Sequence, residues 1–185
     1  MQAILDSTLI VALAEMGDKT QLLSLMLVLR YKKPWTIMGA IFLATILNHL
    51  AATWIGSQLA AVIPRQYLQY GLALLFIGFG FWLLKPDSDE GLDQKSSFKS
   101  AFWVALIAFF TAEMGDKTQL VTVALSAKYE APLLVALGST LGMMAANSLS
   151  VFGGERFIKI VPMNYVRIGA CIVFLIFGIV MLPVW

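Results

Sequence analysis

Two copies of one polar motif interrupt an otherwise apolar sequence. The residues Glu-Met-Gly-Asp-Lys-Thr-Gln-Leu begin at Glu15 and begin again at Glu113. Together the copies supply four carboxylates, which are those of Glu15, Asp18, Glu113 and Asp116. Oxygen ligands suit hard cations such as Ca²⁺, Mg²⁺ and Mn²⁺, and the sequence holds no cluster of cysteine and histidine that would favour Zn²⁺ or Cu²⁺. The motif therefore predicts a site for a divalent metal ion.

The other polar residues of the motif give this site a definite charge. Lys19 and Lys117 offset two of the four carboxylates, so −4 + 2 leaves a formal charge of −2. One divalent cation balances that charge, and proton binding does so when the cation is absent. Amide oxygens are available as further metal ligands and hydroxyls as supporting groups, from Gln21, Gln119, Thr20 and Thr118. We expect the two copies to form one site, each contributing half of it.

The direction of these side chains depends on whether the helix through each motif is continuous. At about 100° per residue, Asp18 and Lys19 share one stripe of a helix with Glu15. Thr20 points almost the opposite way, and only an unwound turn brings its hydroxyl to the same side. Gly17, which Gly115 matches in the second copy, is the obvious place for such a turn. The sequence leaves the continuous and the broken helix open.

Charges at this depth are expensive unless they are paired or bound. Glu15 lies about ten residues into its apolar stretch, which is about 15 Å along a helix and near the middle of a bilayer. Six uncompensated charges there would cost on the order of 15–20 kcal/mol. Two self-contained ion pairs that hold helices together are the structural alternative. A duplicated intramembrane cluster favours the functional interpretation.

Three further polar residues lie at similar depth in neighbouring apolar stretches. Asn48 and Asn147 either complete the cation site or form hydrogen bonds between helices. His49 is either a ligand or proton-relay member, or a packed histidine, and packing is favoured. At the spacing between the motifs, His49 corresponds to Asn147 and Asn48 to Ala146, so this layer is only partly symmetric.

Long apolar stretches must position all of these residues. The 185-residue chain is 59% hydrophobic and 13% charged, and its mean hydropathy is +0.82, which lies outside the range of soluble proteins. A membrane-spanning helix needs about 20 mostly apolar residues. Six stretches are close to this length or longer, at 7–29, 35–62, 68–84, 101–127, 133–153 and 166–182. We predict an all-α polytopic membrane protein with six transmembrane helices.

The two halves of the chain are copies of each other. The offset between the motifs, 113 − 15 = 98, also pairs Pro34 with Pro132 and Gly80 with Gly178. Matched residues so far from the motif indicate a duplicated three-helix unit. Because three crossings are an odd number, we expect an inverted repeat of the kind found in secondary transporters. One membrane domain then consists of a first repeat, a linker and a second repeat, at 1–85, 86–99 and 100–185.

The basic residues outside the motif set the predicted orientation. One side of the membrane receives Arg30, Lys32, Lys33, Lys85, Lys95, Lys99, Arg156, Lys159 and Arg167, and the other receives Arg65 and Lys128. The positive-inside rule then places the central linker in the cytoplasm and both termini outside. The acidic run inside the linker predicts a solvated tether.

Several function classes find no support in the sequence. The net charge is only +2, and no basic run with interleaved aromatic residues indicates nucleic-acid binding. A phosphate-binding loop for an ATP-driven pump is absent, as are nucleophile–base and metal-hydrolase motifs of enzymes. We expect no bound cofactor. Two alternatives stay open, an exporter of small organic cations or amino acids and a non-transporting membrane scaffold.

Two Glu-x-Gly-Asp-(Lys/Arg)-(Thr/Ser) motifs, one opening each half of a six-helix chain, resemble the Gdt-type cation/proton exchangers. That family includes bacterial manganese exporters of the MneA kind and Golgi and chloroplast Ca²⁺/Mn²⁺ transporters. The likeness covers nearly the whole chain, and neither copy departs from the motif. The matching positions are Glu15, Gly17, Asp18, Lys19, Thr20, Glu113, Gly115, Asp116, Lys117 and Thr118.

The resemblance implies a secondary transporter that exports Mn²⁺, with Ca²⁺ as a further candidate, in exchange for protons. The ligand types alone admit Ca²⁺ or Mg²⁺ equally. The short loops are similar to those of the bacterial members, which implies the bacterial inner (plasma) membrane. The expected partners are the lipid bilayer, the divalent cation and the proton. The sequence indicates no oligomeric state.

Overall fold

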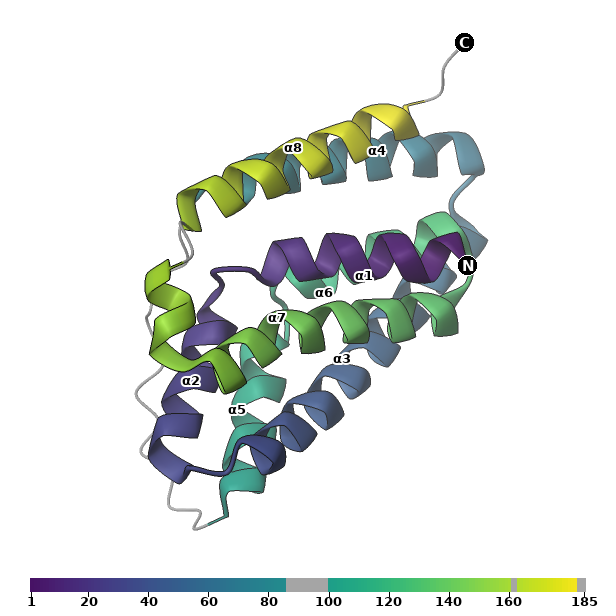
Figure 1. The fold of residues 1–185 in the computed structure, drawn as a ribbon. Helices are drawn as coiled ribbons and strands as arrows, with labels where there is room; N and C mark the ends of the chain where they lie inside the picture. The colour runs from purple at the N-terminus through teal and green to yellow at the C-terminus, as the bar shows by residue number, and fades with distance from the viewer. Residues whose placement is uncertain (86–99, 161–162, 183–185) are drawn as a thin grey trace.

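The computed structural model describes residues 1–85, 100–160 and 163–182, and for residues 155–160 and 163 it describes the backbone alone. This part of the chain is all-helical, with eight α-helices (Figure 1). They are α1 (Gln2–Glu15), α2 (Lys19–Tyr31), α3 (Pro34–Val62), α4 (Arg65–Trp82), α5 (Ala101–Glu113), α6 (Lys117–Tyr129), α7 (Pro132–Ile160) and α8 (Met163–Met181). The linker expected at 86–99, with its acidic run, lies outside the described residues.

Two of the six expected stretches are each divided into two helices. α1 and α2 divide the stretch at 7–29, and α5 and α6 divide the one at 101–127. The four pieces are 13 or 14 residues long, so each extends only about 20 Å and is too short to cross a hydrocarbon core alone. Among the described residues, three helical segments are long and apolar enough to do so, at Pro34–Val62, Pro132–Gly154 and Asn164–Met181. Six crossings stay a prediction.

Matching residues begin and end helices in the two halves. Pro34 begins α3 and Pro132 begins α7, because the fixed φ of proline suits the first turn of a helix. The residue directly after α2, Lys32, has a φ of 52°, and the residue directly after α6, Glu130, has a φ of 49°, both in the left-handed conformation common at helix ends. These two ends are separated by 130 − 32 = 98 residues, the offset of the motif.

The symmetry fails near the end of α7. This helix continues to Ile160, beyond the expected end at 153, and it contains a break at Gly154, where φ is 61° and ψ is −154°. The matching Gly56 lies within continuous α3, where a Cβ would lie only 2.3 Å from the carbonyl oxygen of Val123. The glycine of α3 therefore serves close packing against α6, whereas the glycine of α7 serves a bend.

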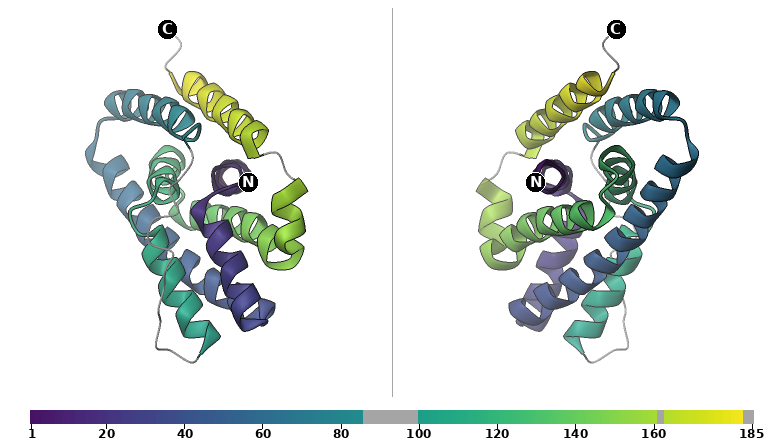
Figure 2. Two further views of the ribbon diagram at one scale, coloured as in Figure 1. Left: turned by 90° about the vertical axis from the view of Figure 1, so that its left-hand side faces the viewer. Right: turned by 90° about the vertical axis from the view of Figure 1, so that its right-hand side faces the viewer.

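The helices of the two halves interlock. α1 packs along α7 and α5 along α3, while α3 also contacts α6. α4 and α8 lie side by side and cover α1 and α6 (Figures 1 and 2). Gly80 of α4 faces the backbone of Cys171, and Gly178 of α8 faces that of Ala73. Since 171 − 73 and 178 − 80 both equal 98, this contact is two-fold symmetric.

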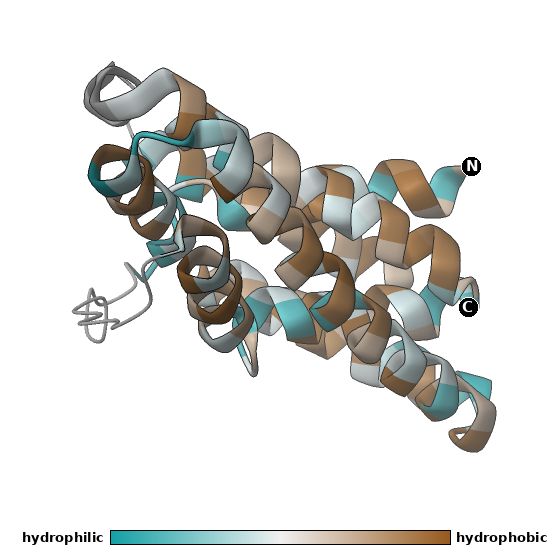
Figure 3. Cartoon of the chain, turned by 90° about the horizontal axis from the view of Figure 1, so that it is seen from below, coloured by the Kyte–Doolittle hydropathy of each residue, from teal (hydrophilic) through white to brown (hydrophobic). Residues whose placement is uncertain are grey.

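The polar and apolar residues are distributed as in a membrane protein. Large apolar side chains are exposed on all eight described helices, for example Leu9, Leu29, Phe42, Leu74, Ile107, Leu120, Leu141 and Ile172. Figure 3 shows that hydrophobic positions recur along the helices. Small hydroxyl residues are fully buried instead, including Ser7, Ser24, Thr45, Thr122 and Ser139. Such a surface favours contact with lipid, because a soluble protein rarely exposes so much contiguous apolar area.

Candidate cation site

Each motif contains a non-helical turn that joins two short helices. Such a turn separates α1 from α2, and another separates α5 from α6. Gly17 and Gly115 both have a φ of 78°, a conformation that only glycine adopts without penalty. Gln21 closes the first turn by accepting a hydrogen bond from the Gly17 N–H at 2.9 Å, and Gln119 accepts one from Gly115 at 2.7 Å. The helices are therefore broken, which answers the question that the sequence left open.

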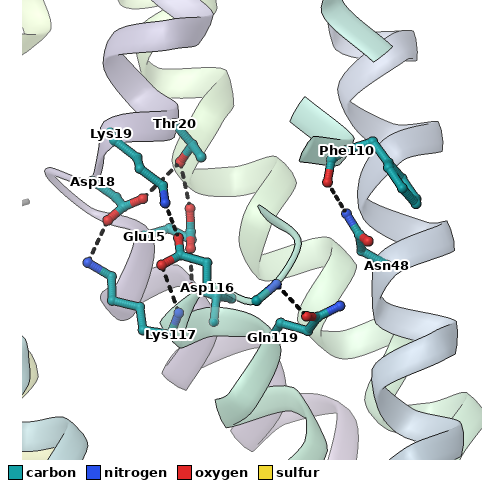
Figure 4. A network of polar contacts seen from close by, with 11 residues as sticks. Glu15, Asp18, Lys19, Thr20, Asn48, Phe110, Asp116, Lys117 and Gln119 are labelled. Carbon is teal, nitrogen blue, oxygen red and sulfur yellow. Dashed lines mark hydrogen bonds and ion pairs between the residues drawn. The ribbon is translucent and has the colours of Figure 1, made fainter. Parts of the chain in front are cut away.

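Two ion pairs connect the turns, and both run between the halves of the chain (Figure 4). The Nζ of Lys117 lies 2.5 Å from Oδ1 of Asp18, and the Nζ of Lys19 lies 3.2 Å from Oδ2 of Asp116. Each lysine thus pairs with the aspartate of the other motif. The Lys117–Asp18 pair is sealed, with side chains 7% and 0% exposed, whereas those of Lys19 and Asp116 are 29% and 10% exposed.

Glu15 is held by one threonine from each motif. The Thr20 hydroxyl donates to Oε2 of Glu15 at 2.8 Å, and the Thr118 hydroxyl donates to Oε1. The carboxylate is completely buried. Thr20 reaches Glu15 because the chain is unwound at Gly17, as the helical geometry required. Both hydroxyls therefore serve the same glutamate.

Glu113 occupies the matching position but has different surroundings. It is also buried, and its Oε1 lacks a hydrogen-bond partner, as does Oδ1 of buried Asn147. Among the described residues, no three His, Cys, Asp or Glu side chains are gathered closely enough to hold a metal ion. The structure therefore brings the motif carboxylates to adjoining turns, but it holds Glu15, Asp18 and Asp116 on lysine and threonine donors instead of around a common centre. A buried oxygen without a donor is a position where a cation would relieve an unmet interaction.

Of the other polar residues expected near the site, Asn48 and His49 contact neighbouring helices, whereas Asn147 bonds within its own helix. Asn48 Nδ2 donates to the carbonyl oxygen of Phe110 at 3.1 Å, one turn before Glu113 (Figure 4). Asn147 Nδ2 donates within its own helix at 3.2 Å. His49 is buried, with Nδ1 lying 3.3 Å from the Thr140 hydroxyl of α7. The asparagine in α3 thus links two helices beside the second motif, and the histidine contacts a hydroxyl of the facing helix.

One residue near the motif was not predicted to be part of the site. Nη2 of Arg167, in the first turns of α8, lies 3.4 Å from the carbonyl oxygen of Gly17. From the sequence, Arg167 is only one of the basic residues that orient the chain in the membrane. Its match in the first half is Gln69, since 167 − 98 = 69. A charge present in one copy and absent from the other was the signal that could have identified it.

Comparison with known proteins identifies the family of the whole chain. The profile of the divalent cation/proton antiporter GDT1 matches residues 3–91 and 101–183. The chain belongs to the GDT1 family. This confirms the predicted resemblance and makes the chain a membrane transporter for cations, not an enzyme.

Relatives from bacteria and a plant extend over almost the whole chain. A candidate manganese exporter of Vibrio cholerae is 43% identical over 90% of this chain and 84% of its own length. GDT1-like protein 5 of Arabidopsis thaliana is 29% identical over 97% of this chain and 94% of its own. A GDT1-like protein of Synechocystis is 26% identical over 93% and 92%. No solved structure matches.

Proposed function

We propose that this chain exports Mn²⁺ from the cytoplasm in exchange for protons, with Ca²⁺ as a second candidate cargo. The Vibrio relative is named for manganese export and the GDT1 family for divalent cations and protons, which supports this cargo and this mode of coupling. The proposed location is the bacterial inner membrane. Both termini lie outside and the central linker in the cytoplasm, as the distribution of lysine and arginine favours.

The two ion pairs between the motifs are the observation on which this proposal depends. Lys117 binds Asp18 and Lys19 binds Asp116, so the two motifs already meet across the halves of the chain. Four carboxylates and two ammonium groups leave a formal charge of −2 at this point, and one divalent cation neutralises it. A merely structural pairing would need no such excess of negative charge.

Binding of the cation requires the carboxylates to change partners. The proposed ligands are the oxygens of Glu15, Asp18, Glu113 and Asp116, with the unpartnered Oδ1 of Asn147 as a further donor. Gln21 and Gln119 hold the turns in this conformation, and their amide oxygens become available once the glycine N–H groups release them. Asn48 positions the end of α5. In the proton-loaded state, protons replace the cation on the carboxylates.

Alternating access then follows from the repeat. We propose that the halves are inverted in the bilayer and that the broken helices move relative to α3 and α7. The unequal exposure of the two ion pairs supports this idea, because one half of the site is sealed while the other is partly open.

The test is Mn²⁺ flux into or out of liposomes that contain the purified protein, with an imposed pH gradient. Wild-type protein should move Mn²⁺ and carry protons in the opposite direction. Asp18→Asn and Asp116→Asn should each abolish the flux, because each removes a proposed ligand and the carboxylate that pairs with a lysine of the other motif. Asp6→Asn is the matched control, since this carboxylate of α1 lies outside the site and contacts Tyr129.

Three results would count against parts of the proposal. Normal flux in both motif variants would reject the site. Flux that ignores the pH gradient and moves no protons would reject the exchange mechanism while leaving the site intact. Competition by organic cations or amino acids, but not by Ca²⁺ or Mg²⁺, would reject a metal cargo.

A further inference from the structure

Arg167 contacts the backbone of the first motif at the point where the helix is broken. Its Nη2 lies 3.4 Å from the carbonyl oxygen of Gly17, and the side chain is partly buried between α8 and the turn. We propose that the Arg167 guanidinium occupies an oxygen that the transported cation would otherwise use, and that it must withdraw when the cation binds. This inference rests on the proposed function and assigns a specific role to α8.

The Gly17 carbonyl is a suitable cation ligand because the break removes it from the helical hydrogen-bond pattern. Within the turn, the carbonyl oxygens of Glu15 and Asp18 accept backbone N–H groups at 3.1 Å. The Gly17 oxygen accepts the guanidinium instead. Carbonyls of unwound segments are the groups that broken-helix transporters offer to cations. Arg167 therefore stands where a positive charge is favoured.

The charge of the site indicates why Arg167 must leave. With Arg167 included, four carboxylates, two lysines and one arginine give −4 + 2 + 1 = −1. A divalent cation would raise this sum to +1 while the guanidinium is in place and to 0 once it has withdrawn. An unbalanced charge in a low-dielectric site is strongly unfavourable. Cation binding and guanidinium binding at this turn therefore oppose each other.

The second motif has no equivalent arginine. Gln69, which matches Arg167, lines a cavity of about 390 Å³ together with Arg65 and Lys128, near the end of α6. α8 packs against α1, whereas α4 packs against α6. Met114, in the turn of the second motif, is 63% exposed. The guanidinium thus blocks one half of the site only, so the halves are not equivalent despite their identical motifs.

The experiment measures Mn²⁺ affinity and transport for Arg167→Gln, which installs the residue of the matching position. Removal of a competing charge should tighten Mn²⁺ binding about tenfold, with a lower KM and a lower maximal rate, because release is slower. Arg167→Lys keeps the charge, so its affinity should stay within about twofold of wild type. Arg65→Gln is the control. It removes the same charge at the first residue of α4, the end of that helix away from the first motif (Figure 1), and should leave the affinity for Mn²⁺ unchanged.

A purely structural role for Arg167 predicts the opposite result, which is weaker binding in Arg167→Gln. Unchanged or weaker affinity in a folded Arg167→Gln protein would overturn the inference, provided that wild type binds and moves Mn²⁺. If wild type does neither, the proposed function itself fails. Hydrogen–deuterium exchange on wild type provides a second measurement if the variant does not fold. Mn²⁺ should increase exchange in residues 164–170, and unchanged exchange there would also overturn the inference.

Discussion

Lys117 and Lys19 occupy matching positions in the two motifs, but their side chains differ in solvent exposure. The ammonium group of Lys117 is enclosed with a fully buried aspartate, whereas Lys19 keeps 29% of its side chain exposed. Water screens the second pair, so the Coulomb energy of Lys19 with Asp116 is smaller. The same substitution should therefore have different consequences in the two copies.

Lys117→Met should reduce the free energy of unfolding by about 3–5 kcal/mol, because Asp18 is left buried without its cation. The double variant Lys117→Met with Asp18→Asn should recover most of that loss. Lys19→Met is the matched control, and it should reduce the free energy of unfolding by clearly less. Unfolding midpoints of purified protein in detergent provide the comparison, and equal losses from the two lysines would contradict the difference in burial.

Thr118→Val should destabilise the protein by about 1–3 kcal/mol, since the change removes a hydrogen bond to the buried carboxylate of Glu15. Thr118→Ser should restore the hydroxyl and most of the stability. Thr111→Val tests specificity, because Thr111 is exposed and bonds only to carbonyl oxygens of its own helix. The measurement is the thermal unfolding midpoint of the three variants. Equal midpoints for Thr118→Val and Thr111→Val would show that the contact with Glu15 is unimportant.

The residues of the candidate site could be proposed from sequence, but the contacts they make with one another could not. Depth and duplication singled out the four carboxylates, and Gly17 was the expected place for a break if Thr20 was to face them, although the sequence left a continuous helix equally open. Which lysine binds which aspartate depends on the packing of α1 on α7 and of α5 on α3, and no local pattern encodes that packing. Arg167 was missed for the same reason, because α8 and the first turn are far apart in the chain.

At the scale of elements, two glycines determine how closely α1 approaches α7. A Cβ at Gly142 would lie 2.5 Å from the carbonyl oxygen of Thr8, and one at Gly138 would lie 2.6 Å from that of Ile4. The Thr8 hydroxyl donates to the Gly138 carbonyl at 3.0 Å across this contact. Because α1 ends in the first motif, the contact also positions Glu15.

Gly142→Ala should cost about 1–3 kcal/mol of stability, since backbone atoms must move to admit the methyl group. It should also reduce Mn²⁺ flux, because α1 shifts together with its motif. Gly71→Ala is the control, as its Cβ would meet no atom within 4 Å, and alanine favours the helix there. Unfolding midpoints and liposome flux should separate the variants, and a harmless Gly142→Ala would argue against close packing.

Helix types and most of their ends followed from apolar length and from proline, whereas the broken spans show the limit of that reasoning. A hydropathy pattern cannot distinguish one long helix from two short ones joined at Gly17 or Gly115, because their compositions are identical. The bend at Gly154 is absent from its match Gly56. Backbone conformation at a glycine is decided by what packs around it.

At the scale of the whole molecule, the proposed orientation can be tested with single cysteines. The native Cys171 is buried, and Cys171→Ser provides a cysteine-free background. In this background, Gln2→Cys should react with a membrane-impermeant maleimide on intact cells. Gln94→Cys, in the linker, should react only after the membrane is permeabilised. The reverse pattern would invert the orientation, and labelling of both positions in intact cells would exclude a cytoplasmic linker.

Because each lysine pairs with the aspartate of the other motif, mutations in the two copies are expected to compensate for each other. A mutation at Asp18 affects Lys117 of the other copy most directly, although Lys19 is its neighbour in sequence. We therefore expect second-site suppressors of Asp18 substitutions at codon 117, at a distance of 117 − 18 = 99 codons. The two motif segments of one gene should therefore coevolve, as the genes of two interacting subunits do.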